Sequence, residues 1–246
     1  MRITIMSERK IMVGLPLYAG NLKPEFMKSY IRARSKGFFH RETMPNGDSL
    51  VTRARNNITH SFLESDCTHL LFLDDDLEFH SDHIAMLLEN DKGIVCGMYP
   101  KKQLKLQPVL SRLPDGQGEQ EGHLITVREA GTGFMMISRQ VFEAIMSLEP
   151  ENHYIDDNDK SLRYDFWKVG VFKDDGDEYG RYLSEDWYFC WKARQLGFKT
   201  WVDTRILVAH IGQYSYPLEQ SELKELNEHY NKIQGVADEM AREDNS

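Results

Sequence analysis

The sequence has 246 residues, 41% of them hydrophobic and 28% charged, and a formal net charge of −9. These values are those of an ordinary globular protein with one substantial core, either one large domain or two fused lobes. The acidic balance argues against a nucleic-acid partner, because phosphate backbones bind to basic surfaces.

The cysteines indicate a reducing compartment, and the hydropathy indicates a chain without a membrane span. Cys67, Cys96 and Cys190 lie far apart and form no CxxC pair, which is typical of buried thiols rather than of a disulfide framework. No apolar run approaches the ~20 residues of a membrane span. We therefore expect a soluble cytoplasmic protein without a membrane span.

Strand and helix patterns alternate along the first hundred residues. Apolar runs at residues 10–16, 68–73 and 93–98 predict buried strands, and helical periodicity predicts helices over 49–64 and 81–90. This alternation predicts a parallel, doubly wound α/β sheet. Ligands of such sheets bind beyond the carboxyl ends of the strands, so we expect a crevice where the first two of these strands end.

The pattern changes after residue 100. We expect strands over 131–137 and 200–209 and helices over 139–146 and 184–196. The polar segment 149–181 has little periodicity and predicts a long loop. From residue 217 onward, apolar residues recur three and four apart. This spacing predicts an amphipathic helix, which either packs on its own domain or joins a second subunit in a homo-oligomer.

Three consecutive carboxylates, Asp74, Asp75 and Asp76, follow the apolar strand at 68–73. Adjacent negative charges beside a buried strand are unfavourable unless a positive group lies among them. A hard divalent cation, Mn²⁺ or Mg²⁺, prefers carboxylate oxygens and leaves positions for substrate phosphates. The alternative is a solvated acidic turn that caps the helix near residue 81.

Further candidate residues lie where predicted elements begin and end. His210 follows the strand at 200–209 and is either a metal ligand or an ordinary structural histidine. Glu185 and Asp186 open the helix at 184–196. The helix dipole alone explains carboxylates at that position, and it would also keep a general base ionised beside a pocket.

The predicted helix at 49–64 carries Arg53, Arg55 and Asn56 just ahead of the acidic strand. A basic group there is placed to reach a nucleotide or its diphosphate. Salt bridges to surface carboxylates are the alternative interpretation.

Taken in chain order, five motifs resemble those of GT-A fold glycosyltransferases of the family 2 type: TRARNN, LLFLDDD, GTGFMMISRQVF, SEDWYFCWKARQLGFKTW and VAHIG. The resemblance implies an α/β fold with a Rossmann-like, mostly parallel central sheet flanked by helices and followed by a C-terminal helical tail. It assigns residues 1–100 to the nucleotide-sugar-binding half of one domain and residues 101–216 to its acceptor-binding and catalytic half. The tail then comprises residues 217–246.

The resemblance also implies roles for individual residues. Asp74 and Asp76 match the Asp-x-Asp pair and are both expected to be metal ligands, with Asp76 as the main ligand of a divalent metal on the donor diphosphate, and His210 matches a further metal ligand. Asp75 occupies the position that contacts the ribose. Asp186 matches the carboxylate that deprotonates the acceptor hydroxyl.

Further positions follow from the same resemblance. Pro16, Leu17 and Tyr18 fall where the nucleotide base and ribose are held, and Gly133 falls where donor sugar and acceptor meet. Glu185 belongs to the catalytic Glu-Asp pair. With Arg53 and Asn56 these residues complete the expected donor and catalytic contacts.

The implied function is transfer of a sugar from a nucleotide-diphosphate donor, with a UDP-sugar as the expected partner, to a hydroxyl of a glycan or glycoside acceptor. Inversion with Asp186 as the base is the expected course. The rivals are a retaining transferase on the same fold, a metal-dependent phosphohydrolase or nucleotidyltransferase that uses the aspartates alone, and a sugar-binding module without catalysis.

Overall fold

The computed structural model describes residues 9–17, 22–103, 107–114, 116–174, 176–212, 214–217, 221 and 224. Two predictions lie outside the described residues: Tyr18, and nearly all of the helix expected over 217–246 with the oligomer contact that it would make. No helix in the described part of the chain is long and apolar enough to cross a membrane.

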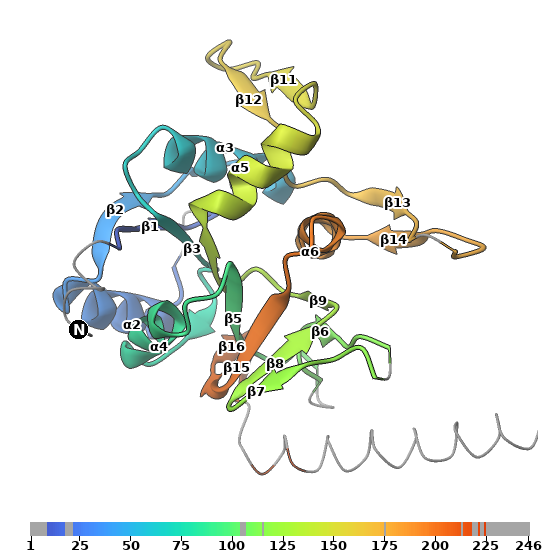
Figure 1. Ribbon diagram of the computed structural model, residues 1–246. Coiled ribbons are helices and arrows are strands. Elements are labelled where there is room, and N and C mark those ends of the chain that lie inside the picture. Colours follow the sequence, from blue (N-terminus) through green and yellow to red (C-terminus); the bar gives the residue numbers. More distant parts are fainter. Residues whose placement is uncertain are drawn as a thin grey trace, which may run out of the picture.

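An eight-stranded sheet forms the centre of the molecule (Figure 1). Its strands, in spatial order, are β2 (Phe39–Thr43), β1 (Ile11–Gly14), β3 (His69–Leu73), β10 (Phe134–Ser138), β5 (Ile94–Met98), β15 (Thr200–Leu207), β8 (Leu124–Val127) and β7 (Gln120–Glu121). β1 pairs in parallel with β2 and β3, and β5 pairs in parallel with β15. The predicted α/β class with a mostly parallel central sheet flanked by helices is confirmed.

Strand β10 departs from the parallel pattern. It runs antiparallel between β3 and β5, so a strand from the second half of the sequence separates two strands of the first half. The prediction of a parallel sheet built from the first hundred residues was wrong in this respect. Because both neighbours oppose β10, β3 and β5 point the same way and their carboxyl ends meet at one edge of the sheet.

Helices cover both faces of the sheet (Figure 1). Three pack on one face: α3 (Val51–Leu63), α5 (Arg139–Leu148) and α6 (Glu185–Gln195). Two pack on the other: α2 (Pro24–Ser35) and α4 (Asp82–Glu89). Alternation along β3 sends Leu70 and Phe72 into the first core and Leu71 and Leu73 into the second. Burial on both faces explains why this strand is apolar throughout.

The segment 149–181, predicted as a long loop, contains two β-hairpins instead. They are β11–β12 (His153–Ile155 with Leu162–Tyr164) and β13–β14 (Gly170–Phe172 with Arg181–Leu183), which project from the body in Figure 1. Between the hairpins, Trp167 is fully buried and stacks on Phe189 of α6 with ring centroids 4.4 Å apart. Strands of three residues are too short to produce a visible periodicity, so the polar turns dominate the sequence pattern.

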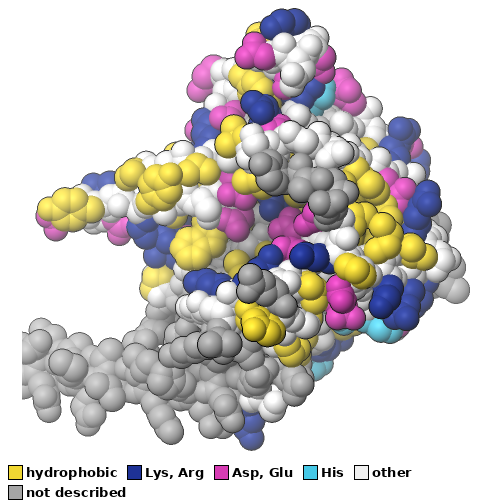
Figure 2. Space-filling view, turned by 180° about the vertical axis from the view of Figure 1, so that it is seen from behind, with side chains coloured by type: hydrophobic (Ala, Val, Ile, Leu, Met, Phe, Trp, Pro, Cys, Tyr) yellow, Lys and Arg dark blue, Asp and Glu magenta, His cyan; other side chains and the backbone are white. Residues whose placement is uncertain are grey.

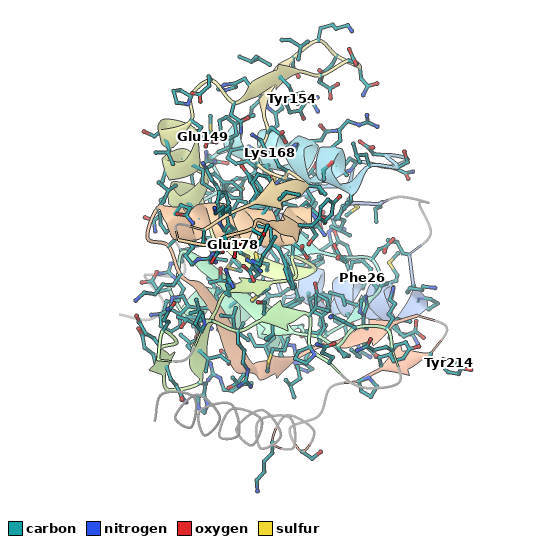
Figure 3. All side chains as sticks on the ribbon, turned by 90° about the vertical axis from the view of Figure 1, so that its right-hand side faces the viewer. Phe26, Glu149, Tyr154, Lys168, Glu178 and Tyr214 are labelled. Atoms are coloured by element: carbon teal, nitrogen blue, oxygen red, sulfur yellow. The ribbon has the colours of Figure 1, made fainter. Side chains whose placement is uncertain are left out.

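A three-stranded sheet connects the end of β3 to the last described strands. β4 (Leu77–Glu78) pairs antiparallel with β16 (Ala209–Ile211), which pairs with β17 (Ser215–Tyr216). A further pair is formed by β6 (Leu110–Ser111) and β9 (Glu129–Ala130). Figure 3 shows Tyr214, beside β17, at the opposite end of the molecule from Tyr154 on β11. Because β4 starts directly after Asp76 and β16 contains His210, their pairing brings these two residues together.

Truncating a large side chain in the core between α5 and the sheet should cause a large loss of stability. Phe142 is fully buried and its ring contacts Phe62, Phe166 and Phe189 at centroid distances of 5.6, 5.2 and 5.4 Å. We expect Phe142→Ala to lower the free energy of unfolding by about 3–5 kcal/mol, measured by urea denaturation. Leu148→Ala, at a half-exposed position of the same helix, is the control and should change it by less than about 1 kcal/mol. Equal losses in both variants would contradict the described packing.

Candidate active site

Charged and polar side chains gather at the carboxyl ends of the parallel strands β3, β5 and β15. The aspartates 74–76 follow β3, Tyr99 to Lys102 follow β5, and His210 follows β15. Figure 2 shows acidic and basic side chains around a hollow beside the projecting hairpin β13–β14. This is the edge of an α/β sheet at which ligands bind.

Arg55 lies at the centre of this cluster. Its Nη2 is 3.2 Å from Asp74 Oδ1 and its Nε is 3.4 Å from Glu185 Oε1. Only 5% of the side chain is exposed, and the guanidinium lies 5.3 Å from the ring centre of Phe72 and 5.9 Å from that of Trp167. A guanidinium buried this deeply requires carboxylate partners. Arg55 therefore joins α3, the end of β3 and the start of α6.

A side-chain nitrogen lies beside each carboxylate oxygen of Asp76. Oδ2 forms an ion pair with Lys102 Nζ, and Oδ1 faces His210 Nε2 at 3.4 Å. Burial works to raise the pKa of Asp76, but the neighbouring His210 and Lys102 outweigh it and hold this pKa below its ordinary value. Asp76 is thus an ionised carboxylate across the physiological pH range.

The tautomer of His210 follows from its other contact. Nδ1 lies 2.8 Å from the carbonyl oxygen of Pro100, and a carbonyl oxygen only accepts, so Nδ1 carries the proton. Nε2 is then the nitrogen that faces Asp76. Metal-ligating histidines are commonly oriented in this way, with the second ring N–H donated to a backbone carbonyl.

The Asp76–His210 pair fits a divalent cation. Asp76 Oδ1 is buried and makes no hydrogen bond, and its 3.4 Å separation from Nε2 is close to the roughly 3 Å between adjacent ligands of an octahedral ion with bonds of about 2.1 Å. Carboxylate oxygen with imidazole nitrogen suits Mn²⁺ or Mg²⁺. Within the described residues no three His, Cys, Asp or Glu side chains converge on one point. The remaining ligands would therefore come from a substrate or from water.

The middle aspartate has a different environment. Burial, followed by the charges of Asp76 and Asp74, raises the pKa of Asp75 to about 6. Its backbone oxygen accepts a hydrogen bond from Lys23 N at 3.3 Å, which ties the acidic turn to the segment entering α2. Asp75 therefore exchanges a proton near neutral pH.

Asp186 is the second carboxylate with a raised pKa. Burial, and then the charge of Glu185, raises the pKa of Asp186 to about 6, although Ser184 and Arg55 oppose the shift. Ser184 Oγ and Trp187 N, the latter at 2.8 Å, both donate to Asp186 Oδ1. The other oxygen, Oδ2, takes no part in these two bonds. A carboxylate of this kind accepts a proton readily near pH 7.

Glycines allow the backbone before β10 to approach the cluster. Gly133 O accepts a hydrogen bond from Asp74 N at 2.9 Å, and Gly133 N donates to Tyr99 Oη at 3.0 Å. A Cβ at Gly133 would lie 2.8 Å from Asp74 Oδ2, and one at Gly131 would collide with Tyr99 Oη. Between the two glycines, Thr132 Oγ1 is buried without a hydrogen-bond partner. Gly133 thus lies beside the acidic cluster.

The structure separates the polar residues of α3 that the sequence grouped together. Arg53 forms a two-point ion pair with Asp48, at 2.8 Å for each contact, on the surface. Asn56 donates to Asp165 Oδ1 at 2.8 Å and accepts from Phe166 N at 2.9 Å. Arg55 is therefore the member of the group that lies in the cluster, while Asn56 fastens the segment between the hairpins.

Pro16 and Leu17 lie at the end of β1, next to β3 in the sheet. Leu17 is buried and its backbone N–H donates to Pro45 O at 3.2 Å. The pair therefore lines the same edge of the sheet as the aspartates, at the neighbouring strand. Their predicted contact with a nucleotide base stays a prediction.

Two residues of the cluster were not predicted from the sequence, Tyr99 and Lys102. Both follow β5. Ligands bind at the carboxyl ends of parallel strands, but the sequence-based crevice was expected only where the first two predicted strands end, and not at the strand over 93–98. Applying it to residues 99–102 would have found them.

No family model and no curated protein matches the sequence. Among solved structures, A197 from STIV is similar, with a TM-score of 0.52, 18% identity, and coverage of 82% of this chain and 86% of that one; this likeness shows a shared fold. Weaker similarity, with a TM-score of 0.32, 13% identity and coverage of 58% and 68%, links the chain to a glycosyltransferase involved in the glycosylation of the major capsid of PBCV-1. The inositol-1-phosphate CTP transferase from T. maritima has a TM-score of 0.42 and 11% identity over 83% and 89%.

The buried position of Arg55 predicts a strong effect of its removal. Arg55→Met leaves Asp74 and Glu185 without their cation, so we expect a loss of about 3 kcal/mol in the free energy of unfolding at pH 8. Protonation of the freed carboxylates should make the loss smaller at pH 5. Arg53→Met, which breaks an exposed pair two residues away, is the control and should cost less than about 1 kcal/mol in urea denaturation at either pH. A loss no greater than that of the control would contradict the central role of Arg55.

Proposed function

We propose that the chain is a metal-dependent glycosyltransferase of the GT-A type, which moves a sugar from a nucleotide-diphosphate donor to a hydroxyl of a glycan or glycoside with inversion. The observation that carries this proposal is that the Asp76–His210 pair, whose donor atoms suit a divalent cation, and a separate carboxylate with a raised pKa both lie at one strand-end edge. Sugar transfer needs both a group that neutralises the leaving diphosphate and a base for the acceptor.

Asp76 and His210 are the residues that would hold Mn²⁺ or Mg²⁺. The bound ion would supply positive charge to the departing diphosphate. Asp74 is fixed by Arg55 and the backbone of Gly133, and it keeps the turn in position for Asp76. Asp75, at the centre of the turn, is the proposed contact to the ribose of the donor, for which a UDP-sugar is our preferred candidate.

Asp186 is the proposed general base. Two donors occupy Oδ1, so Oδ2 is the oxygen to accept the proton of the acceptor hydroxyl. The raised pKa suits this step, because a base whose pKa lies near the working pH both exists ionised and binds the proton firmly. Glu185 supports it indirectly: it pairs with Arg55 and its charge helps to raise the pKa of Asp186.

A cavity of about 510 Å³ is the proposed place for the acceptor. Its lining residues come from the start of α3 and from the segment between the hairpins: Leu50, Thr52, Asp165, Trp167, Lys168, Val169 and Phe172. Thr52 lies one helical turn before Arg55, and the ring of Phe172 packs 4.5 Å from that of Tyr188 on α6. The ring of Trp167, another lining residue, lies 5.9 Å from the guanidinium of Arg55, so the cavity adjoins the cluster. Its lining combines charged, hydroxyl and aromatic groups that suit a sugar.

A phosphohydrolase or nucleotidyltransferase that uses the aspartates alone leaves Asp186 without a role. A retaining double displacement would need, in addition to these groups, an enzyme nucleophile placed beside the donor sugar. Inversion gives Asp186 a role as the base and the Asp76–His210 pair a role at the leaving diphosphate, and it is the mechanism that the following experiments test.

Nucleotide release tests the proposal directly. We expect release of a nucleoside diphosphate from one member of a panel of UDP-, GDP- and TDP-sugars with Mn²⁺, and its loss in EDTA. Asp76→Asn should reduce this release by at least about a hundredfold, because it removes the charged ligand of the cation. Asp66→Asn, at the other end of β3, is the control and should retain it. Release of inorganic phosphate or pyrophosphate instead would favour the phosphohydrolase or nucleotidyltransferase.

The pKa of Asp186 predicts the pH dependence of transfer. Below pH 6 the base is protonated, so kcat/KM should fall about tenfold per pH unit, and it should level off above pH 7. Asp186→Asn should abolish transfer while the binding of donor and Mn²⁺ persists. Because Asp75 also has a pKa of about 6, Asp75→Asn is the control and should keep the acid limb. Loss of the acid limb in Asp75→Asn would show that protonation of Asp75, and not of Asp186, limits transfer at low pH.

The same pKa has a consequence for stability. A carboxyl whose pKa is raised by folding binds its proton more firmly in the folded state, so the stability it contributes is present near pH 4 and is lost as the pH rises through 6. Asp186→Asn removes this loss, and we expect it to be more stable than the wild type at pH 8 by about 3 kcal/mol. At pH 4 the two proteins should unfold at the same urea concentration. A variant less stable than the wild type at pH 8 would contradict the raised pKa.

A further inference from the structure

Lys102 occupies the side of Asp76 that does not face His210. Its Nζ forms an ion pair with Asp76 Oδ2, and 38% of the Lys102 side chain is exposed. Asp76 Oδ1 meanwhile faces His210 Nε2 at 3.4 Å. The candidate cation site therefore already has a positive side chain of its own.

The backbone around Lys102 holds this side chain at the cluster. Lys101 N donates to Gln107 O at 2.8 Å, and Pro100 forms a bridge to Pro108, so the turn after β5 is closed at its base. The stem of Lys102 runs beside Gly212, where an added Cβ would lie 3.3 Å from Lys102 Cδ. The side chain thus lies between the turn after β5 and the end of β16.

Lys102 and Arg55 are cations of different kinds. Arg55 is buried and has two carboxylate partners, so it cannot leave without a large penalty. The Lys102–Asp76 pair is partly exposed, and such pairs exchange readily because water replaces the lost contact. A lysine also has a flexible stem and three donors, which suit phosphate oxygens.

We propose that Lys102 is an exchangeable internal cation: it neutralises Asp76 in the free protein, yields this carboxylate to the divalent metal, and then contacts the donor diphosphate. The inference rests on the proposed function. A metal bound to Asp76 would place two further positive charges beside the ammonium group, and their repulsion drives Lys102 away. A diphosphate bound to that metal would be an anion close to the displaced ammonium group.

This proposal predicts effects of opposite sign in one variant. Lys102→Gln removes the competitor, so we expect it to bind Mn²⁺ about tenfold more tightly in the absence of nucleotide. It also removes a diphosphate contact, so we expect UDP or GDP to bind about tenfold more weakly at saturating Mn²⁺. Titration calorimetry and the electron paramagnetic resonance of free Mn²⁺ measure both affinities without any turnover.

Matched variants separate this effect from a general change in charge. Lys101→Gln removes the adjacent lysine, whose Nζ contacts Gln107 rather than a carboxylate, and it should alter either affinity by less than about twofold. Lys102→Arg keeps the charge and should bind Mn²⁺ as the wild type does. Asp76→Asn should lose Mn²⁺ binding, which places the ion at this carboxylate.

Different outcomes test the competition for Asp76 and the contact with the diphosphate separately. Unchanged or weaker Mn²⁺ binding by Lys102→Gln overturns the competition for Asp76. Tighter Mn²⁺ binding together with unchanged nucleotide affinity overturns the transfer of Lys102 to the diphosphate. If the wild type binds Mn²⁺ but none of UDP, GDP and TDP, the proposed function fails, and the Mn²⁺ affinities of Lys102→Gln and Lys101→Gln still decide the competition.

Discussion

The burial of one positive charge organises this end of the molecule. Arg55 is stable in the interior only while Asp74 and Glu185 accept its hydrogen bonds, so the end of β3 and the start of α6 must meet at α3. The next residue, Asn56, uses its amide to hold Asp165. The segment that lines the proposed acceptor cavity is therefore fastened to the same helix that fixes the acidic cluster.

The antiparallel strand β10 extends this constraint to the backbone. Its direction brings the residues before it, rather than those after it, to the carboxyl ends of β3 and β5. Gly133 can then bridge Asp74 and Tyr99 with its own carbonyl and amide groups. Side chains larger than hydrogen do not fit there, which is the physical reason for the Gly-Thr-Gly sequence. In a purely parallel sheet, the residues after this strand would lie at this edge instead of the glycines before it.

The sequence was sufficient for those features that depend on local pattern. The apolar strand before Asp74 and the acidic start of α6 are visible as periodicity and position, and they were predicted correctly as elements. The sequence did not predict which of Arg53 and Arg55 lies in the cluster, because this depends on which face of the helix meets the sheet. The hairpins were missed because their strands are too short to show alternation. Helix α2 was not predicted either, although its Pro24 start is a recognised signal.

The charges of the cluster divide into a permanent and an adjustable set. The pairing of Arg55 with Asp74 and Glu185 stabilises the fold, and nothing in the proposed reaction requires it to change. Asp186 is different: burial works against its ionised form, so the fold loses stability by keeping an effective base near neutral pH. Lys102, partly exposed and singly paired, belongs with Asp186 in the adjustable set. A site built in this way can exchange cations and protons at its open side while its buried side stays fixed.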